Sequence, residues 1–167
     1  IMSTTPSATK RAVDAAEFAH GILTTALSDF PVDKGTFQTS PSDNHLLWHL
    51  GHMATTYEWF ASTLDGKPVT TSESDNALFG MGSKPVPDAK KYPSAAELRK
   101  RYDEAWRRFT AAAKALRDED ATKAPLVETG GFLKDRLDAV EKMAWHDGWH
   151  AGQVVGLRKA LGMKSVF

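Results

Sequence analysis

The chain of 167 residues contains no cysteine. This absence excludes disulfides, thiolate nucleophiles and metal sites with sulfur ligands, so a thiol could take part in the chemistry only as a cofactor or substrate. The sequence also has no excess of either charge, since 21 lysine and arginine residues balance 21 aspartate and glutamate residues. Proteins that bind nucleic acid usually carry a basic excess. We therefore expect no nucleic-acid partner.

Long apolar runs are missing as well. The longest has only a few residues, whereas a helix that spans a membrane needs about 20, so we expect no membrane partner. Residues 1–9 are polar and lack the apolar segment of a signal peptide. Together with the absence of cysteine, this favours a cytoplasmic location. Residues 1–7 are predicted to be a disordered tail in front of a single domain over residues 8–162.

What the sequence does contain is helical periodicity. Apolar residues recur at the spacing of an amphipathic helix over about residues 8–27, 40–64, 94–116 and 134–161. No strand pattern competes with these four segments. We therefore predict an all-α fold, a four-helix bundle, in a chain that is long enough to bury a core.

Capping signals mark the ends of these segments. Ser40 followed by proline is typical of a helix start, and Ser94 with Glu97 forms the pattern of a capping box. Gly148 and Gly152 lie inside the last segment, where each glycine costs about 1 kcal/mol relative to alanine. Such a cost is tolerated more readily where backbone or bulky groups must approach closely.

The connection between the second and third segments, residues 66–93, is unusually long. It is rich in glycine and proline, and a loop of this length in a compact domain is normally functional or a crossover. We predict a crossover that travels the length of the bundle. A loose surface loop is the alternative. The apolar residues Leu78 and Phe79 indicate that part of the connection packs against the domain.

Five of the six histidines fall into two clusters on two predicted helices. His146 and His150 are four residues apart, so their imidazoles lie one turn apart on the same face and can converge on one ion. On a helical wheel this face also carries Met143 and Leu157, and it is therefore predicted to be buried. The spacing alone favours a metal site about as strongly as it favours core histidines that are satisfied by hydrogen bonds.

The second cluster shifts this balance towards a metal. His45, His49 and His52 share one side of their predicted helix, and Trp48 and Trp59 flank this polar strip. Buried polar groups without partners cost several kcal/mol, and a metal ion would engage them. Three histidines and an exchangeable water form the open pattern of a catalytic zinc-type site, while imidazole also suits nickel, iron or copper.

The motifs Leu-Gly-His-Met at residues 50–53 and His-Asp-Gly-Trp-His-Ala-Gly-Gln at residues 146–153 resemble the DinB/YfiT-like superfamily of metalloenzymes. The likeness covers essentially the whole domain, including the long connection. It implies that His52, His146 and His150 bind the metal. The family usually has a single histidine in its second helix, whereas this chain adds His45 and His49, which leaves His49 as a rival ligand to His52.

The resemblance also implies a function. Characterised relatives use the metal to activate a thiol cofactor, as bacillithiol or mycothiol transferases and a mycothiol-dependent isomerase. We therefore expect a metal-dependent enzyme whose zinc, nickel or iron ion activates a low-molecular-weight thiol or water. The reaction would be S-transfer to, or hydrolysis of, a small electrophilic molecule. The alternative is a non-catalytic stress-response bundle that binds a metal or small ligand, and a homodimer through exposed helix faces is compatible with either.

Two further patterns are given structural roles. Glu17 and His20 match the Glu-x-x-His element of di-iron bundles, but only one copy occurs, so His20 is predicted to be a helix-face histidine. Trp145 and Trp149 flank the histidine motif of the last segment. We predict that they pack in the core or at its rim, with the lining of a substrate entrance as the alternative.

Overall fold

The computed structural model describes residues 6–166 of the chain. Its elements are α1 (Ala8–Ser28), η1 (Val32–Lys34), α2 (Leu46–Asp65), α3 (Glu73–Phe79), η2 (Ala89–Lys91), α4 (Ala95–Ala115), α5 (Asp118–Ala121) and α6 (Arg136–Ala160). Residues 6–166 contain no strand, so the all-α prediction is confirmed. Most of the predicted N-terminal tail, residues 1–5, lies outside the described residues, and Ser7 caps α1 by accepting a hydrogen bond from the amide of Lys10.

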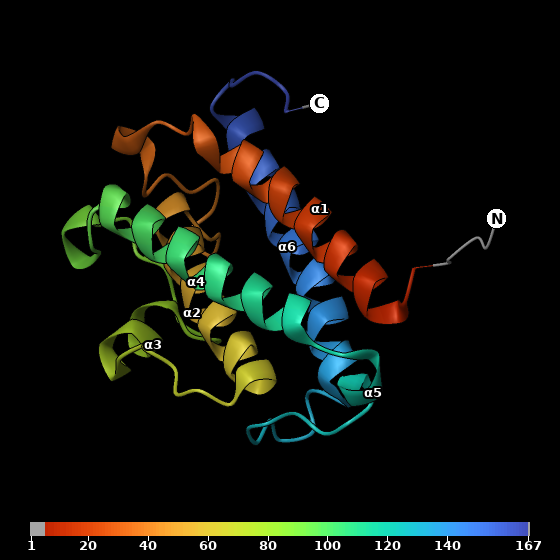
Figure 1. Cartoon of the computed structure of the whole chain (residues 1–167). Helices are drawn as coiled ribbons and strands as arrows, with labels where there is room; N and C mark the ends of the chain where they lie inside the picture. The colour runs from red at the N-terminus through yellow and green to blue at the C-terminus, as the bar shows by residue number, and fades with distance from the viewer. Residues whose placement is uncertain (1–5, 167) are drawn as a thin grey trace.

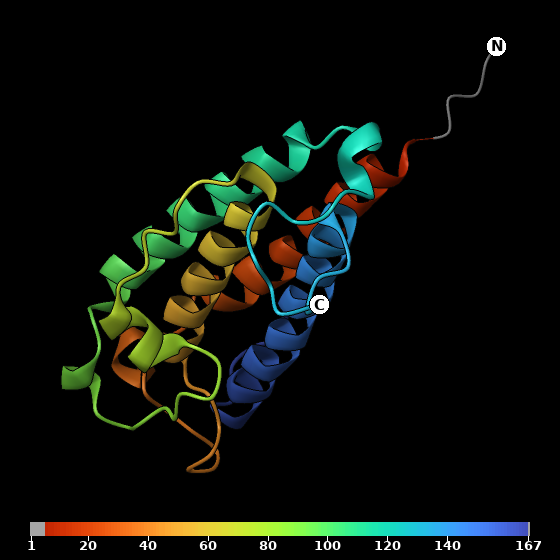
Figure 2. The same cartoon turned by 90° about the horizontal axis from the view of Figure 1, so that it is seen from below.

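The four long helices α1, α2, α4 and α6 lie alongside one another. α1 packs mainly against α6, and α2 packs mainly against α4, as Figures 1 and 2 show. Each of the four contributes to one shared core, in which Leu23, Leu50, Phe109 and Met143 are 0% exposed. None of the described helices is long and apolar enough to cross a membrane.

The second long helix begins later than its sequence indicates. The prediction placed its start near Ser40, but α2 begins at Leu46. Residues 38–43 form a turn instead, in which the Gln38 side chain donates to the Asp43 carbonyl at 2.6 Å and the Asp43 amide donates to the Ser40 carbonyl at 2.9 Å. His45 takes the capping role, because its Nδ1 accepts from the Trp48 amide. The start predicted at Ser40 was therefore wrong by several residues.

The connection from α2 to α4 is ordered by its own helix and by one tight contact. α3 starts with a capping box, in which Ser72 and Asp75 each accept the other's backbone amide. At its end the Phe79 ring is 1% exposed and packs on the backbone of α2 at Gly51, where an added Cβ would lie 2.3 Å from the ring. Only glycine allows this approach, so Gly51 fixes the connection against α2.

A buried polar network joins all four long helices. Tyr57 of α2 donates to the Asp147 carboxylate of α6 at 3.0 Å, and His20 Nδ1 of α1 lies 3.0 Å from the Tyr57 hydroxyl. Tyr102 of α4 lies 3.2 Å from the same nitrogen, and the Trp106 ring stacks on His20. Burial raises the pKa of the Asp147 carboxyl group. His20 thus lies on the face of α1 that is turned toward the other helices, where it joins this network.

Two glycine substitutions separate a required glycine from a tolerated one. Gly51→Ala should lower the free energy of unfolding by about 1–3 kcal/mol, because it overpacks the contact with Phe79. Gly152→Ala should raise it by up to about 1 kcal/mol, since a Cβ at Gly148 or Gly152 meets nothing within 4 Å and no close approach explains these glycines. Urea unfolding followed by circular dichroism measures both. Equal effects of the two substitutions would contradict this packing.

Candidate metal centre

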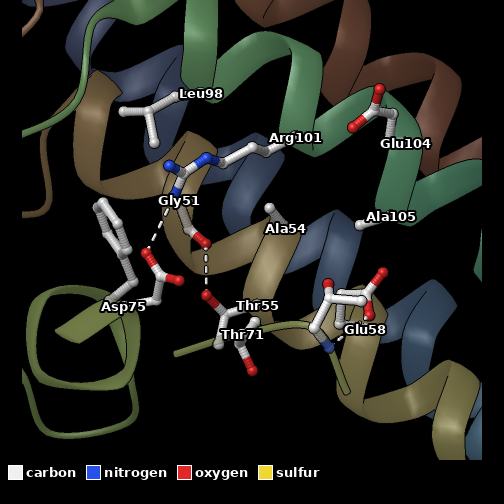
Figure 3. Close-up of a pocket in the computed structure, with 12 residues that line it drawn as sticks. Gly51, Ala54, Thr55, Glu58, Thr71, Asp75, Leu98, Arg101, Glu104 and Ala105 are labelled. Atoms are coloured by element: carbon white, nitrogen blue, oxygen red, sulfur yellow. Dashed lines mark hydrogen bonds and ion pairs between the residues drawn. The ribbon is translucent and has the colours of Figure 1, made fainter. Parts of the chain in front are cut away.

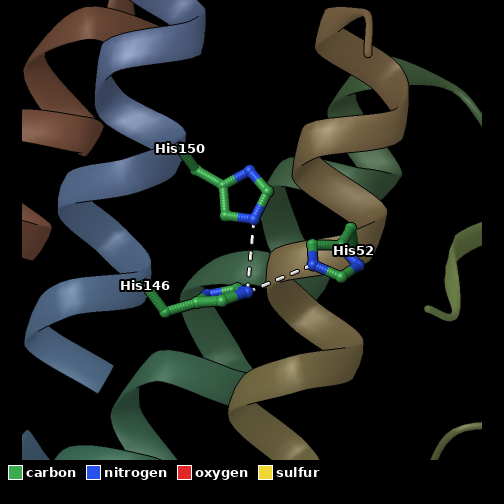
Figure 4. A group of neighbouring side chains, drawn as sticks. All are labelled: His52, His146 and His150. Atoms are coloured by element: carbon green, nitrogen blue, oxygen red, sulfur yellow. Dashed lines mark hydrogen bonds between the residues drawn. The ribbon is translucent and has the colours of Figure 1, made fainter. Parts of the chain in front are cut away.

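Three imidazoles from two helices converge between α2 and α6. His146 Nε2 lies 3.2 Å from His52 Nε2 and 3.2 Å from His150 Nε2. Each of the three offers a ligand nitrogen, and these nitrogens all lie within 4.8 Å of one another. Figure 4 shows His52 reaching from α2 toward His146 and His150, which lie one turn apart on α6. The structure thus brings together the three histidines that the sequence singled out.

The spacing of these nitrogens fits a metal ion. Zinc binds imidazole nitrogen at about 2.0–2.1 Å, so two ligand nitrogens of a tetrahedral site lie about 3.3 Å apart. The distances of 3.2 Å from His146 Nε2 to the other two Nε2 atoms are close to this value. His150 is buried, while His52 and His146 are partly exposed. The three histidines could therefore hold a metal ion and leave a position for an external ligand.

The orientation of His52 is fixed by the connection between α2 and α4. His52 Nδ1 lies 2.7 Å from the Phe79 carbonyl oxygen, which can only accept a hydrogen bond, so Nδ1 carries the proton. In the neutral ring Nε2 then has a free lone pair, and this nitrogen faces His146. The Trp48 ring stacks on His52 at 4.3 Å and donates through Nε1 to the Ser83 hydroxyl at 2.8 Å. Metal-binding histidines typically have such an outer partner on the second nitrogen.

His45 and His49 lie outside the converging group. His45 Nδ1 caps α2, and its Nε2 donates to the Val86 carbonyl at 3.1 Å, so both nitrogens are used for structure. His49 contacts His150 instead, with 3.2 Å between their two Nδ1 atoms. The second nitrogen of His49 and Nδ1 of His146 are buried and have no hydrogen-bond partner among the described residues.

Burial keeps these imidazoles neutral. Burial and, to a smaller extent, the neighbouring His52 together lower the pKa of His146 to about 3. The pKa of His49 falls to about 3 for the same first reason, with His52, His45 and His146 adding to the effect. Burial also lowers the pKa of His52 and of His150. At neutral pH the cluster therefore presents lone pairs, which is the form that binds metal.

The two tryptophans beside the histidine motif lie at the surface. Trp145 and Trp149 are 57% and 58% exposed, and their ring centroids are 5.4 Å apart. The Trp145 ring lies 6.3 Å from that of His146. Of the two expected positions, core or rim, this exposure excludes the core. Their position one turn apart on α6 follows from the helix itself, because residues 145 and 149 are four apart.

The partners that orient the site were not predicted. They are the carbonyl groups of Phe79 and Val86 and the hydroxyl of Ser83. A backbone carbonyl has no signature in the sequence, but the α2 side chains that contact these groups do show a pattern. His45, Trp48 and His52 recur at spacings of three and four residues and so share one face of α2, which indicates that this face needs polar partners.

A separate cavity lies between α2, α3 and α4. It has a volume of about 430 Å³ and is lined by Gly51, Ala54, Thr55, Glu58, Thr70, Thr71, Asp75, Phe79, Leu98, Arg101, Glu104 and Ala105. Figure 3 shows Arg101 pointing toward Asp75 across it, at 3.0 Å. Glu58 is paired with Arg108, so these charges are compensated within the chain. None of the converging histidines lines this cavity.

The comparison with protein families agrees with the geometry. A family model described as the DinB superfamily matches residues 15–154. This span contains all three converging histidines and both partners of the Phe79–Gly51 contact. No curated protein matches the chain.

The lowered pKa values predict that the metal-free protein loses stability in mild acid. The unfolded chain takes up protons on its histidines below about pH 6.5, while His49 and His146 in the folded chain remain neutral down to a pKa of about 3. As the pH falls below about 6.5, the free energy of unfolding should therefore fall by up to about 1.4 kcal/mol per pH unit for each such histidine. Urea unfolding in chelator between about pH 6.5 and 5 tests this. In His146→Asn the unfolding reaction should take up about one proton fewer, so its free energy should depend less steeply on pH. A free energy of unfolding that does not change with pH in the unsubstituted protein would contradict the prediction.

Proposed function

Because the chain belongs to the DinB superfamily, we propose that it is a metal-dependent enzyme in which His52, His146 and His150 bind one divalent ion. The observation that carries this proposal is the 3.2 Å approach of His146 Nε2 to the Nε2 atoms of the two other histidines. Zinc, nickel and iron all suit imidazole ligands. The substrate we propose is a small molecule, which would approach from the side of the two partly exposed histidines, His52 and His146.

The chemistry we propose is transfer of a thiol to, or hydrolysis of, a small electrophile. A bound divalent ion would supply a Lewis acid that lowers the pKa of a thiol or of water. The thiol is a low-molecular-weight cofactor, because the chain has no cysteine. The protein's own contribution is to present three neutral imidazoles and to hold the His52 ring against the Phe79 carbonyl. The exposed rings of Trp145 and Trp149 offer an apolar surface to a substrate at the His146 side.

No carboxylate belongs to the group of converging ligands among the described residues. Asp147 is next to His146 in the sequence, but it accepts from Tyr57 in the buried network. The proposal therefore gives no protein carboxylate the role of general base. A site without such a base also suits the second candidate, a bundle that binds a metal or small ligand without turnover.

Several structural features belong to the same proposal. We assign the four long helices to a four-helix bundle, a single domain over residues 8–162, in which residues 66–93 are the crossover. The bundle assignment is supported by the family match over residues 15–154 and by the pairing of α1 with α6 and of α2 with α4. We further propose a cytoplasmic protein that forms a homodimer through exposed helix faces.

A turnover experiment separates the enzyme from the binding bundle. Zinc- or nickel-loaded protein should accelerate the reaction of a low-molecular-weight thiol with monochlorobimane, an electrophile that becomes fluorescent on thiol transfer. His150→Ala removes one ligand nitrogen and should reduce the rate by at least about 100-fold. His20 belongs to the other polar network, so His20→Gln should retain the rate of the unsubstituted protein. If the loaded protein is no faster than the metal-free one with any thiol and does not hydrolyse activated esters, the binding bundle is the better account.

A further inference from the structure

His49 is the most deeply enclosed histidine next to the candidate metal centre. It is 0% exposed and lies on α2 one turn before His52. Its ring meets that of His150 edge-on, with centroids 5.2 Å apart and an angle of 76° between the planes. The contact is made through nitrogen, since the two Nδ1 atoms are 3.2 Å apart. A polar side chain that is wholly buried needs a reason to be there.

The direction of this hydrogen bond decides which nitrogen of His150 is free. A neutral imidazole has one N–H group and one lone pair. If His49 donated to His150 Nδ1, the proton of His150 would sit on Nε2, the nitrogen that faces His146, and block it. If His49 accepts instead, His150 carries its proton on Nδ1 and its Nε2 lone pair faces the other two histidines. Only the second arrangement is compatible with a metal ligand at His150 Nε2.

From this contact we infer that His49 is a positioning residue, whose Nδ1 accepts a hydrogen bond from His150 Nδ1 and so holds the His150 Nε2 lone pair toward the metal. This role rests on the proposed metal site and extends it to a residue outside the ligand set. It also replaces the earlier alternative in which His49 competes with His52 as a ligand. The Nδ1 atom of His49 faces the non-ligating nitrogen of His150, and His49 is not in the converging group.

The role of His49 parallels that of Phe79. Phe79 accepts from Nδ1 of His52 through its carbonyl oxygen at 2.7 Å, and His49 accepts from Nδ1 of His150 at 3.2 Å. Both partners occupy the nitrogen that is not turned toward the cluster. Two of the three proposed ligands thus have a fixed tautomer, and each is fixed by a group in or against the first half of α2.

Paired substitutions of His49 test the inference through metal affinity. Asn places its side-chain oxygen near the position of Nδ1 and can accept from His150, whereas Leu has a similar volume and cannot. In competition with a chromophoric chelator, His49→Leu should bind zinc about 10–100-fold more weakly than the unsubstituted protein, and His49→Asn should lie within about threefold of it. A role in packing alone predicts the reverse order, because Leu suits a buried site better than Asn does.

A second measurement needs no variant. In the zinc-loaded protein, long-range proton–nitrogen correlation spectra should show the proton of His150 on Nδ1 and that of His49 on Nε2. After replacement of zinc by cadmium, a metal–nitrogen coupling should appear at His150 Nε2 and not at His49. A coupling at His49, or a proton on His49 Nδ1, would overturn the inference. Equal zinc affinity of the unsubstituted protein, His49→Leu and His49→Asn would also overturn the role of His49 but not the metal site. Failure of the unsubstituted protein to bind zinc would overturn the metal site and the role of His49 together.

Discussion

The hydrogen bond between His52 Nδ1 and the Phe79 carbonyl sets the proton position of His52 in the histidine cluster. A carbonyl oxygen only accepts, so the proton lies on Nδ1 and the lone pair of Nε2 faces His146. Desolvation disfavours protonation of the buried rings. Each ring therefore stays neutral and keeps one N–H group and one lone pair. His146 Nε2 lies 3.2 Å from the Nε2 atoms of both His52 and His150, and a cation would stabilise lone pairs that are held this close together. A metal ion meets this requirement.

The packing of the connection between α2 and α4 makes this arrangement possible. The Phe79 ring lies on the backbone of α2 because residue 51 has no side chain, and this contact brings the Phe79 carbonyl to His52. His45 and Trp48 hold the following residues of the connection in the same way, through Val86 and Ser83. One face of α2 thus positions the connection, and the connection orients the site. Two consecutive residues of α6 belong to different groups: His146 lies in the histidine cluster, and Asp147 lies in the network that joins the four long helices.

The sequence predicted the parts of the structure that depend on periodicity. The segment expected at residues 8–27 became Ala8–Ser28, and Ser94 caps α4 as its pattern indicates. His146 and His150 share a face because helical spacing demands it. The start of α2 was missed because side chains of residues 38–43 bond within a turn and compete with helix formation there. α3 was missed although Ser72 and Asp75 form a capping box. The helix has only about two turns, too few to show a periodicity, and its packing on α2 depends on residues that are distant in the sequence.

The central claim is that His52, His146 and His150 together hold one divalent ion, and elemental analysis tests it most directly. The chain, prepared without a histidine tag and dialysed, should contain about one equivalent of zinc, nickel or iron, or should take it up when the metal is added. His150→Ala should lose stoichiometric binding while keeping its helical circular dichroism. A metal content below about 0.1 equivalent that added zinc or nickel does not restore would contradict the account.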